Sequence, residues 1–275
     1  MPSTMNPAHQ LPAMLNPPTH RRLLNDWRVS CFIVFLFALG LRTTHHYYAM
    51  SSPLWDHHLP LYDSRYYDAC ARRIANGDLF GDEVFYLAPA YQYSLALCYR
   101  FLTDDLSTTL FVQSIFGAAS CSMIYWIALR YWGHGVGLVA GLLAACYPLF
   151  ISFDCLLLPY SQTLFLHLAA VVLTIRAADK PFRLSRWITV GLLWGLCAVA
   201  HGTALIITPG VLLWLWLDSG SRTKRLNLIA SGAVAIGCAT MVSVVTIRDY
   251  VVGRDFVLLT SNVGMNLVQG NNTAA

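Results

Sequence analysis

Charge is scarce in this chain: only 12% of the 275 residues are Asp, Glu, Lys or Arg, whereas 56% are hydrophobic. A soluble domain has about 25% charged and about 45 to 50% apolar residues. Several windows of about 17 to 22 residues carry few or no charges, which is the length that a helix needs to cross about 30 Å of hydrocarbon. This composition excludes an ordinary soluble domain and predicts an all-α, polytopic membrane protein.

Other features are missing as well. The formal net charge is only +4, and the basic residues form short clusters between apolar runs, so an extended nucleic-acid surface is excluded. The eight cysteines lack zinc-type spacing, so we predict no metal ligands, and a requirement for a divalent metal stays open. Cys70, Cys98 and Cys155 fall in or near segments expected outside the membrane. One disulfide among these three is open, although their spacing does not demand it.

The N-terminal residues have no apolar core before Arg21 and Arg22, so they are not a cleavable signal peptide. We interpret residues 1–27 as a disordered cytoplasmic tail. Because Arg21, Arg22 and Arg28 precede the first apolar run, the positive-inside rule places the N-terminus in the cytoplasm.

Seven membrane spans are predicted from the apolar runs, at residues 28–49, 106–130, 135–151, 160–175, 187–200, 203–217 and 226–247. Residues 28–247 then form one transmembrane domain that includes an external loop, 51–103. Two shorter helices, 64–76 and 90–102, are expected at the membrane surface within this loop. Residues 248–275 would begin an external segment, which we expect to be truncated.

The parity of the spans supports this topology. If residues 187–217 form two short helices that turn at His201 and Gly202, the basic loops 176–186 and 222–225 both lie in the cytoplasm. A single long helix would move one of these basic loops outside.

The external loop contains the candidate catalytic carboxylate. Asp63 lies at the expected start of the first surface helix, where it can cap the helix or accept the proton of an incoming hydroxyl. Both roles are compatible, because a carboxylate has lone pairs for both. Asp68 is expected to pair with Arg72 four residues later. Further along are three substrate-site candidates in a cluster of rings and carboxylates, which suits a sugar site but also any membrane interface: Asp82, Glu83 and Tyr91.

Four more candidates lie near the outer ends of other spans. Asp154 is either a solvated loop carboxylate or part of a second site, since a carboxylate there is unfavourable unless it is solvated or used. His201 is either a simple turn residue or a functional one. Arg248 and Arg254 follow the last span and either hold a lipid phosphate through bidentate contacts or only anchor the helix end.

Three segments, in this order along the chain, resemble the GT-C superfamily of polyprenyl-phosphate-sugar glycosyltransferases: 63–78, 85–91 and 261–271. This group includes protein O-mannosyltransferases and lipid A aminoarabinose transferases, and the likeness is nearest to bacterial members described as family 39 or RgtA-like. The resemblance extends from about residue 28 to residue 272.

The resemblance implies an inverting transfer of a sugar from a polyprenyl-phosphate carrier to a hydroxyl of a lipid, glycan or protein acceptor. It implies that this reaction occurs at the periplasmic, external face of the bacterial inner membrane. The family's catalytic acidic residue maps onto Asp63, which would act as the base while the lipid phosphate leaves.

Two alternative functions remain from the sequence. A transporter or flippase of lipid-linked saccharides predicts charged or broken helices near the midplane and internal repeats. No internal repeat is present in the sequence. A noncatalytic membrane scaffold explains the apolar spans but gives no reason for so polar a first loop.

Overall fold

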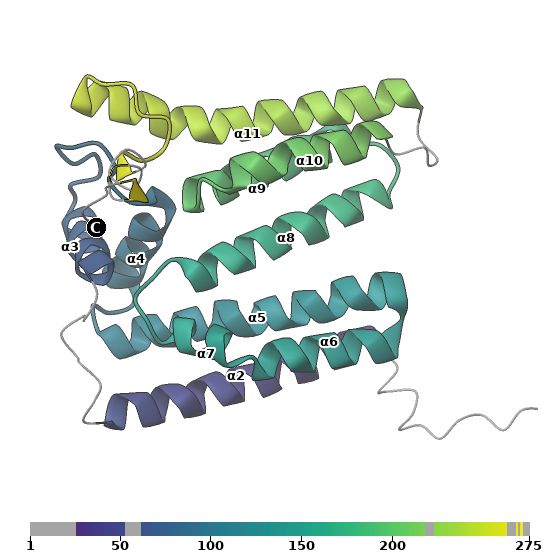
Figure 1. Cartoon of the computed structure of the whole chain (residues 1–275), viewed down its shortest axis with the longest axis horizontal. Helices are drawn as coiled ribbons and strands as arrows, with labels where there is room; N and C mark the ends of the chain where they lie inside the picture. Colours follow the sequence, from purple (N-terminus) through teal and green to yellow (C-terminus); the bar gives the residue numbers. More distant parts are fainter. Residues whose placement is uncertain (1–25, 53–61, 218–222, 263–267, 269, 272–275) are drawn as a thin grey trace, which may run out of the picture.

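The computed structural model describes residues 26–52, 62–217, 223–262, 268, 270 and 271. The regular structure within these residues is α-helical, and the long helices run side by side in one bundle (Figure 1). The predicted tail, residues 1–27, lies almost wholly outside the described residues, as does part of the predicted segment 248–275.

The helices follow the predicted order. Their bounds are α2 (Trp27–Ser51), α3 (Tyr62–Ala75), α4 (Pro89–Phe101), α5 (Leu106–Trp132), α6 (His134–Cys146), α7 (Pro148–Asp154), α8 (Tyr160–Ala178), α9 (Leu184–Ala200), α10 (Ala204–Leu217) and α11 (Lys224–Gly253). Both predicted surface helices are present, as α3 and α4. Each predicted span overlaps one helix, except that the span 135–151 is divided into α6 and α7.

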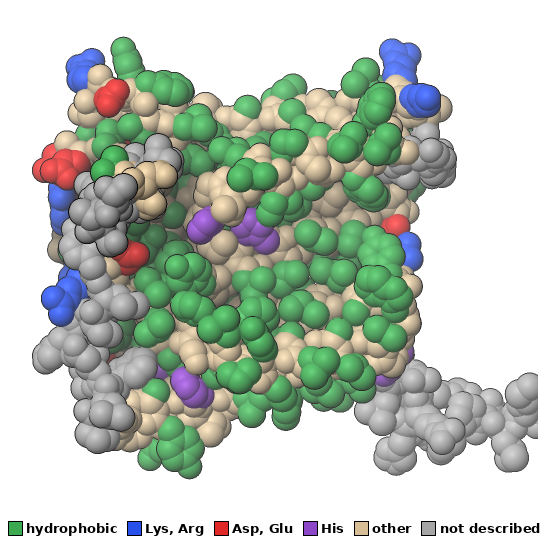
Figure 2. Space-filling view, viewed as in Figure 1, with side chains coloured by type: hydrophobic (Ala, Val, Ile, Leu, Met, Phe, Trp, Pro, Cys, Tyr) green, Lys and Arg blue, Asp and Glu red, His purple; other side chains and the backbone are tan. Residues whose placement is uncertain are grey.

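The helices have the length and composition of membrane spans. Among the described residues, α2, α5, α8 and α11 are each long and apolar enough to cross a bilayer, and the bent pair α6–α7 can add a fifth span. The apolar helices α9 and α10 are shorter, with 17 and 14 residues. Hydrophobic side chains cover the middle of the face in Figure 2, whereas charged side chains gather near its two ends. The all-α polytopic membrane fold is therefore confirmed, while the number of seven spans stays a prediction.

Side chains at the helix starts explain several of the boundaries. Asp26 accepts a hydrogen bond from the Arg28 backbone N–H at the start of α2, and Asp105 does the same for Thr108 at the start of α5. These caps satisfy N–H groups that have no partner inside the helix. Asp63 is the second residue of α3 and so lies in its first turn rather than before it. Gly77 follows the end of α3 with a φ of 105°, as expected of a residue that ends a helix.

The predicted span 135–151 is broken because of its proline. Pro148 has no backbone N–H, and the residue before a proline is disfavoured in the helical conformation. Tyr147 is accordingly extended, with a ψ of 113°, and α6 and α7 meet at an angle of 53°. The expectation of one continuous helix here was wrong.

Small residues bring α9 and α11 close together. A Cβ atom on Gly191 would lie 2.4 Å from the carbonyl oxygen of Val234, and one on Gly237 would lie 2.7 Å from that of Ile188. In a membrane, such close backbone contact provides the van der Waals packing that holds helices together. This helix pair supports the inner wall of the site described below.

The two ends of the bundle differ in character. Helices α3 and α4 lie across one end, which we call the outer end (Figure 1). The chain direction places the α8–α9 connection and the start of α11 at the opposite end, so both predicted basic loops share one side. Arg130 pairs there with Asp179 at 3.0 Å. This arrangement agrees with the geometry that the parity count requires.

We predict that the end bearing the basic loops is cytoplasmic. In a cysteine-free background, a Lys180→Cys variant should react with an impermeant thiol reagent only after the cells are permeabilised. An Asn76→Cys variant at the exposed end of α3 should react in intact cells. Strong labelling of position 180 in intact cells would overturn this topology.

Candidate functional site

The segment between α3 and α4 is clamped against the outer end of α11. Asp249 on α11 has a side chain with 0% exposure, and its Oδ1 accepts a hydrogen bond from the Phe85 N–H at 3.3 Å. The Phe85 carbonyl accepts another from the Ser261 N–H at 2.9 Å. Gly253 permits this approach, because a Cβ atom there would lie 2.3 Å from a methyl carbon of Val84. The backbone of Phe85 is thus bonded on both sides.

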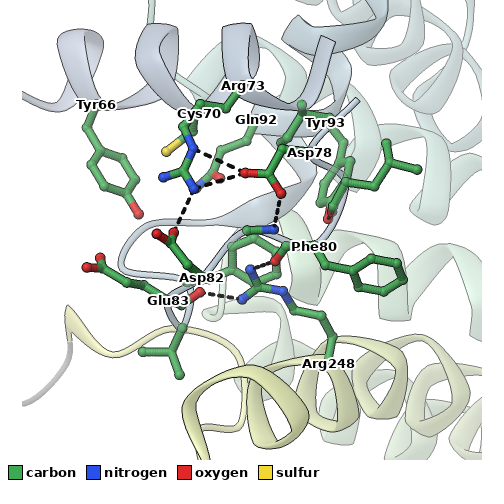
Figure 3. Close-up of a pocket in the computed structure, with 15 residues that line it drawn as sticks. Tyr66, Cys70, Arg73, Asp78, Phe80, Asp82, Glu83, Gln92, Tyr93 and Arg248 are labelled. Atoms are coloured by element: carbon green, nitrogen blue, oxygen red, sulfur yellow. Dashed lines mark hydrogen bonds and ion pairs between the residues drawn. The ribbon is translucent and has the colours of Figure 1, made fainter. Parts of the chain in front are cut away.

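Arg248 completes this clamp. Its Nη1 donates to the Glu83 carbonyl at 2.7 Å and its Nη2 donates to the Phe80 carbonyl (Figure 3). The same Nη1 also donates to Asp249 Oδ1 at 2.6 Å. The guanidinium carbon lies 3.9 Å from the centre of the Phe85 ring, within the range of a cation–π contact. Its Nε is buried and has no partner within the described part of the chain. Arg248 is therefore held by three hydrogen bonds, and its Nε–H and one Nη2–H remain unused.

A polar crevice lies between α3 and the clamped segment. Its polar lining residues are Tyr66, Cys70, Arg73, Asp78, Asp82, Glu83, Gln92, Tyr93 and Arg248. Figure 3 shows the Arg73 guanidinium between two carboxylates, Asp78 at 2.9 Å and Asp82 at 2.6 Å. The hydrogen bond from Arg73 lowers the pKa of Asp82 below its ordinary value. Glu83 forms no ion pair with any described residue.

The neutral groups of the crevice are not nucleophiles near pH 7. Burial raises the pKa of the Cys70 thiol, and burial likewise raises the pKa of the Tyr66 hydroxyl to about 12. Both groups therefore remain protonated and can only donate or accept hydrogen bonds. The charged groups of the crevice are its carboxylates and arginines.

An apolar groove reaches the crevice from the side of the bundle. It has a volume of about 670 Å³ and is lined by side chains of α4, α8, α9 and α11, and we call it the α4–α11 groove. Its lining is almost entirely apolar on α9 and α11, with Leu196, Val199 and Val244 among the residues. Four residues line both the groove and the polar crevice: Phe80, Phe85, Tyr93 and Arg248. Arg248 thus lies where the apolar α4–α11 groove meets the polar crevice.

The structure brings together only some of the predicted site residues. Asp82, Glu83 and Arg248 line the same crevice. Asp63 is exposed and does not line it, although Tyr66, one helical turn later, does. Arg254 is exposed at the end of α11, with a left-handed φ of 55°.

Two other candidates have local structural partners. Tyr91 is 2% exposed, its hydroxyl donates to Gln113 on α5, and its ring contacts that of Tyr67 edge-on at 4.9 Å. Tyr91 thus has structural partners inside the bundle, and its contact with a sugar stays a prediction. His201 lies at the α9–α10 turn, as predicted, where its Nδ1 is 2.9 Å from the Thr203 hydroxyl.

Asp154 is not a solvated loop carboxylate, which corrects that expectation. It is 2% exposed and forms an ion pair with Arg42 of α2, with 2.5 Å between Nε and Oδ2. Ser161 donates to its other oxygen. Gly117 makes room for the pair, because a Cβ atom there would lie 2.1 Å from Asp154 Oδ2. Arg42 was missed, although a lone arginine inside an apolar span signals that a partner lies nearby.

The structure also bears on the predicted ion pair of α3, the cysteines and a metal site. Asp68 pairs with Arg72 at 3.0 Å, which confirms that prediction. Cys70, Cys98 and Cys155 are all free thiols, so no disulfide links them. No group of three or more His, Cys, Asp or Glu side chains within the described ranges is arranged to hold a metal ion.

Comparison with known families decides the class of this protein. A family model described as dolichyl-phosphate-mannose-protein mannosyltransferase matches residues 87–247, more than half of the chain. The chain belongs to this mannosyltransferase family. No curated protein and no solved structure gives a significant match. Membership supports the GT-C resemblance and identifies the protein as a membrane glycosyltransferase. The matched region contains α4 to α10 and most of α11, and with them most of the residues that line the α4–α11 groove. Phe80, Phe85, Arg248 and Val251 of that lining lie outside the match.

The buried Arg42–Asp154 pair yields a stability prediction. Arg42→Leu should lower the free energy of unfolding by about 3 to 5 kcal/mol, because it leaves a buried carboxylate without its partner. The double variant Arg42→Leu/Asp154→Leu should recover most of that loss. Unfolding in a detergent titration measures both. A double variant as unstable as the single one would show that the charges themselves are required.

Proposed function

We propose that this protein transfers a sugar from a polyprenyl-phosphate carrier to a hydroxyl acceptor at the outer end of the bundle. The observation that carries the proposal is the position of Arg248 at the junction of the α4–α11 groove and the polar crevice. Such a donor has a long apolar chain, an anionic phosphate and a polar sugar. The groove, the guanidinium and the crevice offer matching surroundings in the same order.

The hydrogen-bond inventory of Arg248 supports a role in binding phosphate. A guanidinium has five N–H donors, of which two on Nη1 and one on Nη2 are used by the clamp. The Nε–H and the second Nη2–H remain, and the buried Nε has no partner in the described part of the chain. A phosphate accepts two such parallel bonds, and charge-assisted bonds of this type are about twice as strong as neutral ones. A fixed cation here would also stabilise the departing phosphate.

We assign the base to Asp63, on the strength of the family resemblance. It is exposed in the first turn of α3, where its side chain can meet an acceptor that arrives from outside the bundle. Two of its competitors are already engaged: Asp154 pairs with Arg42, and Asp82 pairs with Arg73. Glu83 is the competitor that lines the crevice without an ion pair among the described residues.

The proposed reaction is a single displacement. The acceptor oxygen attacks the anomeric carbon, the bond from that carbon to the phosphate oxygen breaks, and the carboxylate receives the acceptor proton. The configuration at the anomeric carbon is inverted, and polyprenyl phosphate leaves as an anion. Since the basic loops occupy the opposite end, we propose that this chemistry occurs at the periplasmic face of a bacterial inner membrane.

A transporter is less well supported. The break between α6 and α7 and the buried Arg42–Asp154 pair are features that a transporter would share. The pair is enclosed by Ala38, Gly117 and Ser161, however, and neither residue lines the groove or the crevice. Family membership also favours transfer chemistry over transport.

The phosphate role of Arg248 predicts a loss of donor affinity. Arg248→Lys keeps the charge but removes the planar fork, so the apparent KM for the donor should rise by about 10- to 100-fold, as expected for losing a charged hydrogen bond. Arg254→Lys tests whether the second arginine contributes. Measurements with a radiolabelled polyprenyl-phosphate sugar check both. If the variants with both Arg248 and Arg254 changed to lysine, or both changed to alanine, keep the wild-type KM for the donor, the two arginines only anchor the end of the helix.

The base assignment predicts a loss of turnover. Asp63→Asn keeps the shape of the side chain but removes its basicity, so the rate of transfer should fall by about 10²- to 10⁴-fold, while donor binding and folding change little. Glu83→Gln is the matched variant in the crevice. Transfer by Asp63→Asn within about threefold of wild type, together with a large loss in Glu83→Gln, would move the assignment to Glu83.

A further inference from the structure

A second apolar groove lies on the other side of α4. It has a volume of about 420 Å³ and runs between the end of α3 and the outward face of α4, and we call it the α3–α4 groove. Ile74, Ala75 and Leu79 contribute one wall, and Ala96, Leu97 and Phe101 contribute the other. Its size is within the range of about 300 to 1,000 Å³ that is usual for small-molecule sites.

The rim of this groove is apolar and exposed. Leu97 is 59% exposed and Phe101 is 77% exposed, although both are large hydrophobic residues. Leu79 on the facing segment is 56% exposed. A contiguous apolar surface of this kind marks a site of contact with membrane or ligand. We infer that this surface, at the outer end of a membrane bundle, contacts lipid.

The α3–α4 groove is continuous with the polar crevice. Ile74, Leu79 and Tyr93 line both. Tyr93 and Leu97 also line the α4–α11 groove, so α4 forms a ridge between the two apolar grooves. The crevice is therefore reached by two separate apolar grooves, whereas a single lipid donor needs one.

The charge at the edge of the α3–α4 groove indicates what kind of lipid fits. Arg100 lines the groove, is exposed, and forms no ion pair with a described residue. Its neighbours Arg72 and Arg73 on α3 are both neutralised by carboxylates. An unbalanced cation at the end of an apolar groove complements an anionic head group.

We propose that the acceptor is itself an anionic lipid, whose acyl chain lies in the α3–α4 groove and whose head group lies beside Arg100. Its hydroxyl then reaches the crevice from the side opposite to the donor phosphate. This inference rests on the proposed transfer reaction for its donor half. The new glycosidic bond forms at the acceptor oxygen, the acceptor proton goes to the carboxylate base, and polyprenyl phosphate leaves with the electron pair.

The first experiment identifies the occupant of the groove. Phosphatidylglycerol with a photoreactive acyl chain is mixed into phosphatidylcholine vesicles that contain the full-length protein, and the matching photoreactive phosphatidylcholine serves as the neutral probe. Crosslinks to residues 93–101 should be about fivefold stronger with the anionic probe. This preference should vanish in Arg100→Glu. Equal labelling by both probes in wild type would mean that ordinary bilayer lipid fills the groove, which overturns the proposal.

The second experiment links the groove to the reaction. Ala75→Phe fills the groove, and Ala69→Phe is the matched control on the exposed face of the same helix. In membranes of the producing cell supplied with a radiolabelled polyprenyl-phosphate sugar, labelled product should extract with organic solvent and separate from the labelled donor by thin-layer chromatography. Its yield should fall at least tenfold in Ala75→Phe and stay unchanged in Ala69→Phe, while binding of the labelled donor is normal in both.

The outcomes separate the two proposals. Normal donor binding with the label on protein or on a water-soluble glycan overturns the lipid acceptor and leaves the transfer reaction standing. Absence of donor binding in wild type overturns the proposed function itself. If Ala75→Phe does not fold, the phosphatidylglycerol preference and its loss in Arg100→Glu still decide the matter, because that exposed substitution leaves the packing intact.

Discussion

The outer end of this molecule depends on the clamp that Arg248 and Asp249 form on residues 80–85. A buried carboxylate binds the Phe85 backbone, and a neighbouring guanidinium binds two carbonyls and covers the Phe85 ring. These contacts, together with the close approach of Val84 to Gly253, fix the loop between α3 and α4 against α11. With them, the polar crevice and the α4–α11 groove share one wall, and an arginine with an unused donor lies in that wall.

The second constraint is the need to satisfy every polar group in the bilayer. The end of α7 leaves the carbonyls of Asp154 and Leu156 without helical partners, and the Gln113 amide of α5 donates to both, at 3.3 and 2.7 Å. The remaining oxygen of that amide accepts the Tyr91 hydroxyl. The Gln113 side chain that satisfies the carbonyls after α7 therefore also holds α4 on the end of the bundle through Tyr91. Helix α3 is held there in turn, because Tyr67 packs against Tyr91.

Much of the fold could be predicted from the sequence because its information is local. Apolar runs determine the spans, and an i,i+4 pattern was enough to pair Asp68 with Arg72. The break at Tyr147–Pro148 also had a local signal that the length of the apolar run concealed. The Arg42–Asp154 pair joins residues 112 positions apart, and no local sequence pattern around either residue predicts its partner.

The candidate site was only partly predictable for the same reason. Arg248 was singled out as a cation beyond the last span, but α11 continues to Gly253, so Arg248 and Asp249 lie within the helix. That extension explains why the burial of Asp249 was missed. The role of Arg73 in neutralising Asp82 was also missed, because the two belong to different local segments that a turn brings together. Conversely, Asp63 was assigned by resemblance, and the lining of the crevice does not include it.

The central claim is that Arg248 marks the donor phosphate position between an apolar groove and a polar crevice. A structure of the full chain with a bound phosphonate analogue of a polyprenyl-phosphate sugar tests it most directly. The account predicts the phosphonate within hydrogen-bonding distance of Arg248 Nε, the chain in the α4–α11 groove and the sugar in the crevice. A phosphonate bound at Arg254 or elsewhere, with the α4–α11 groove empty of the analogue, would contradict it.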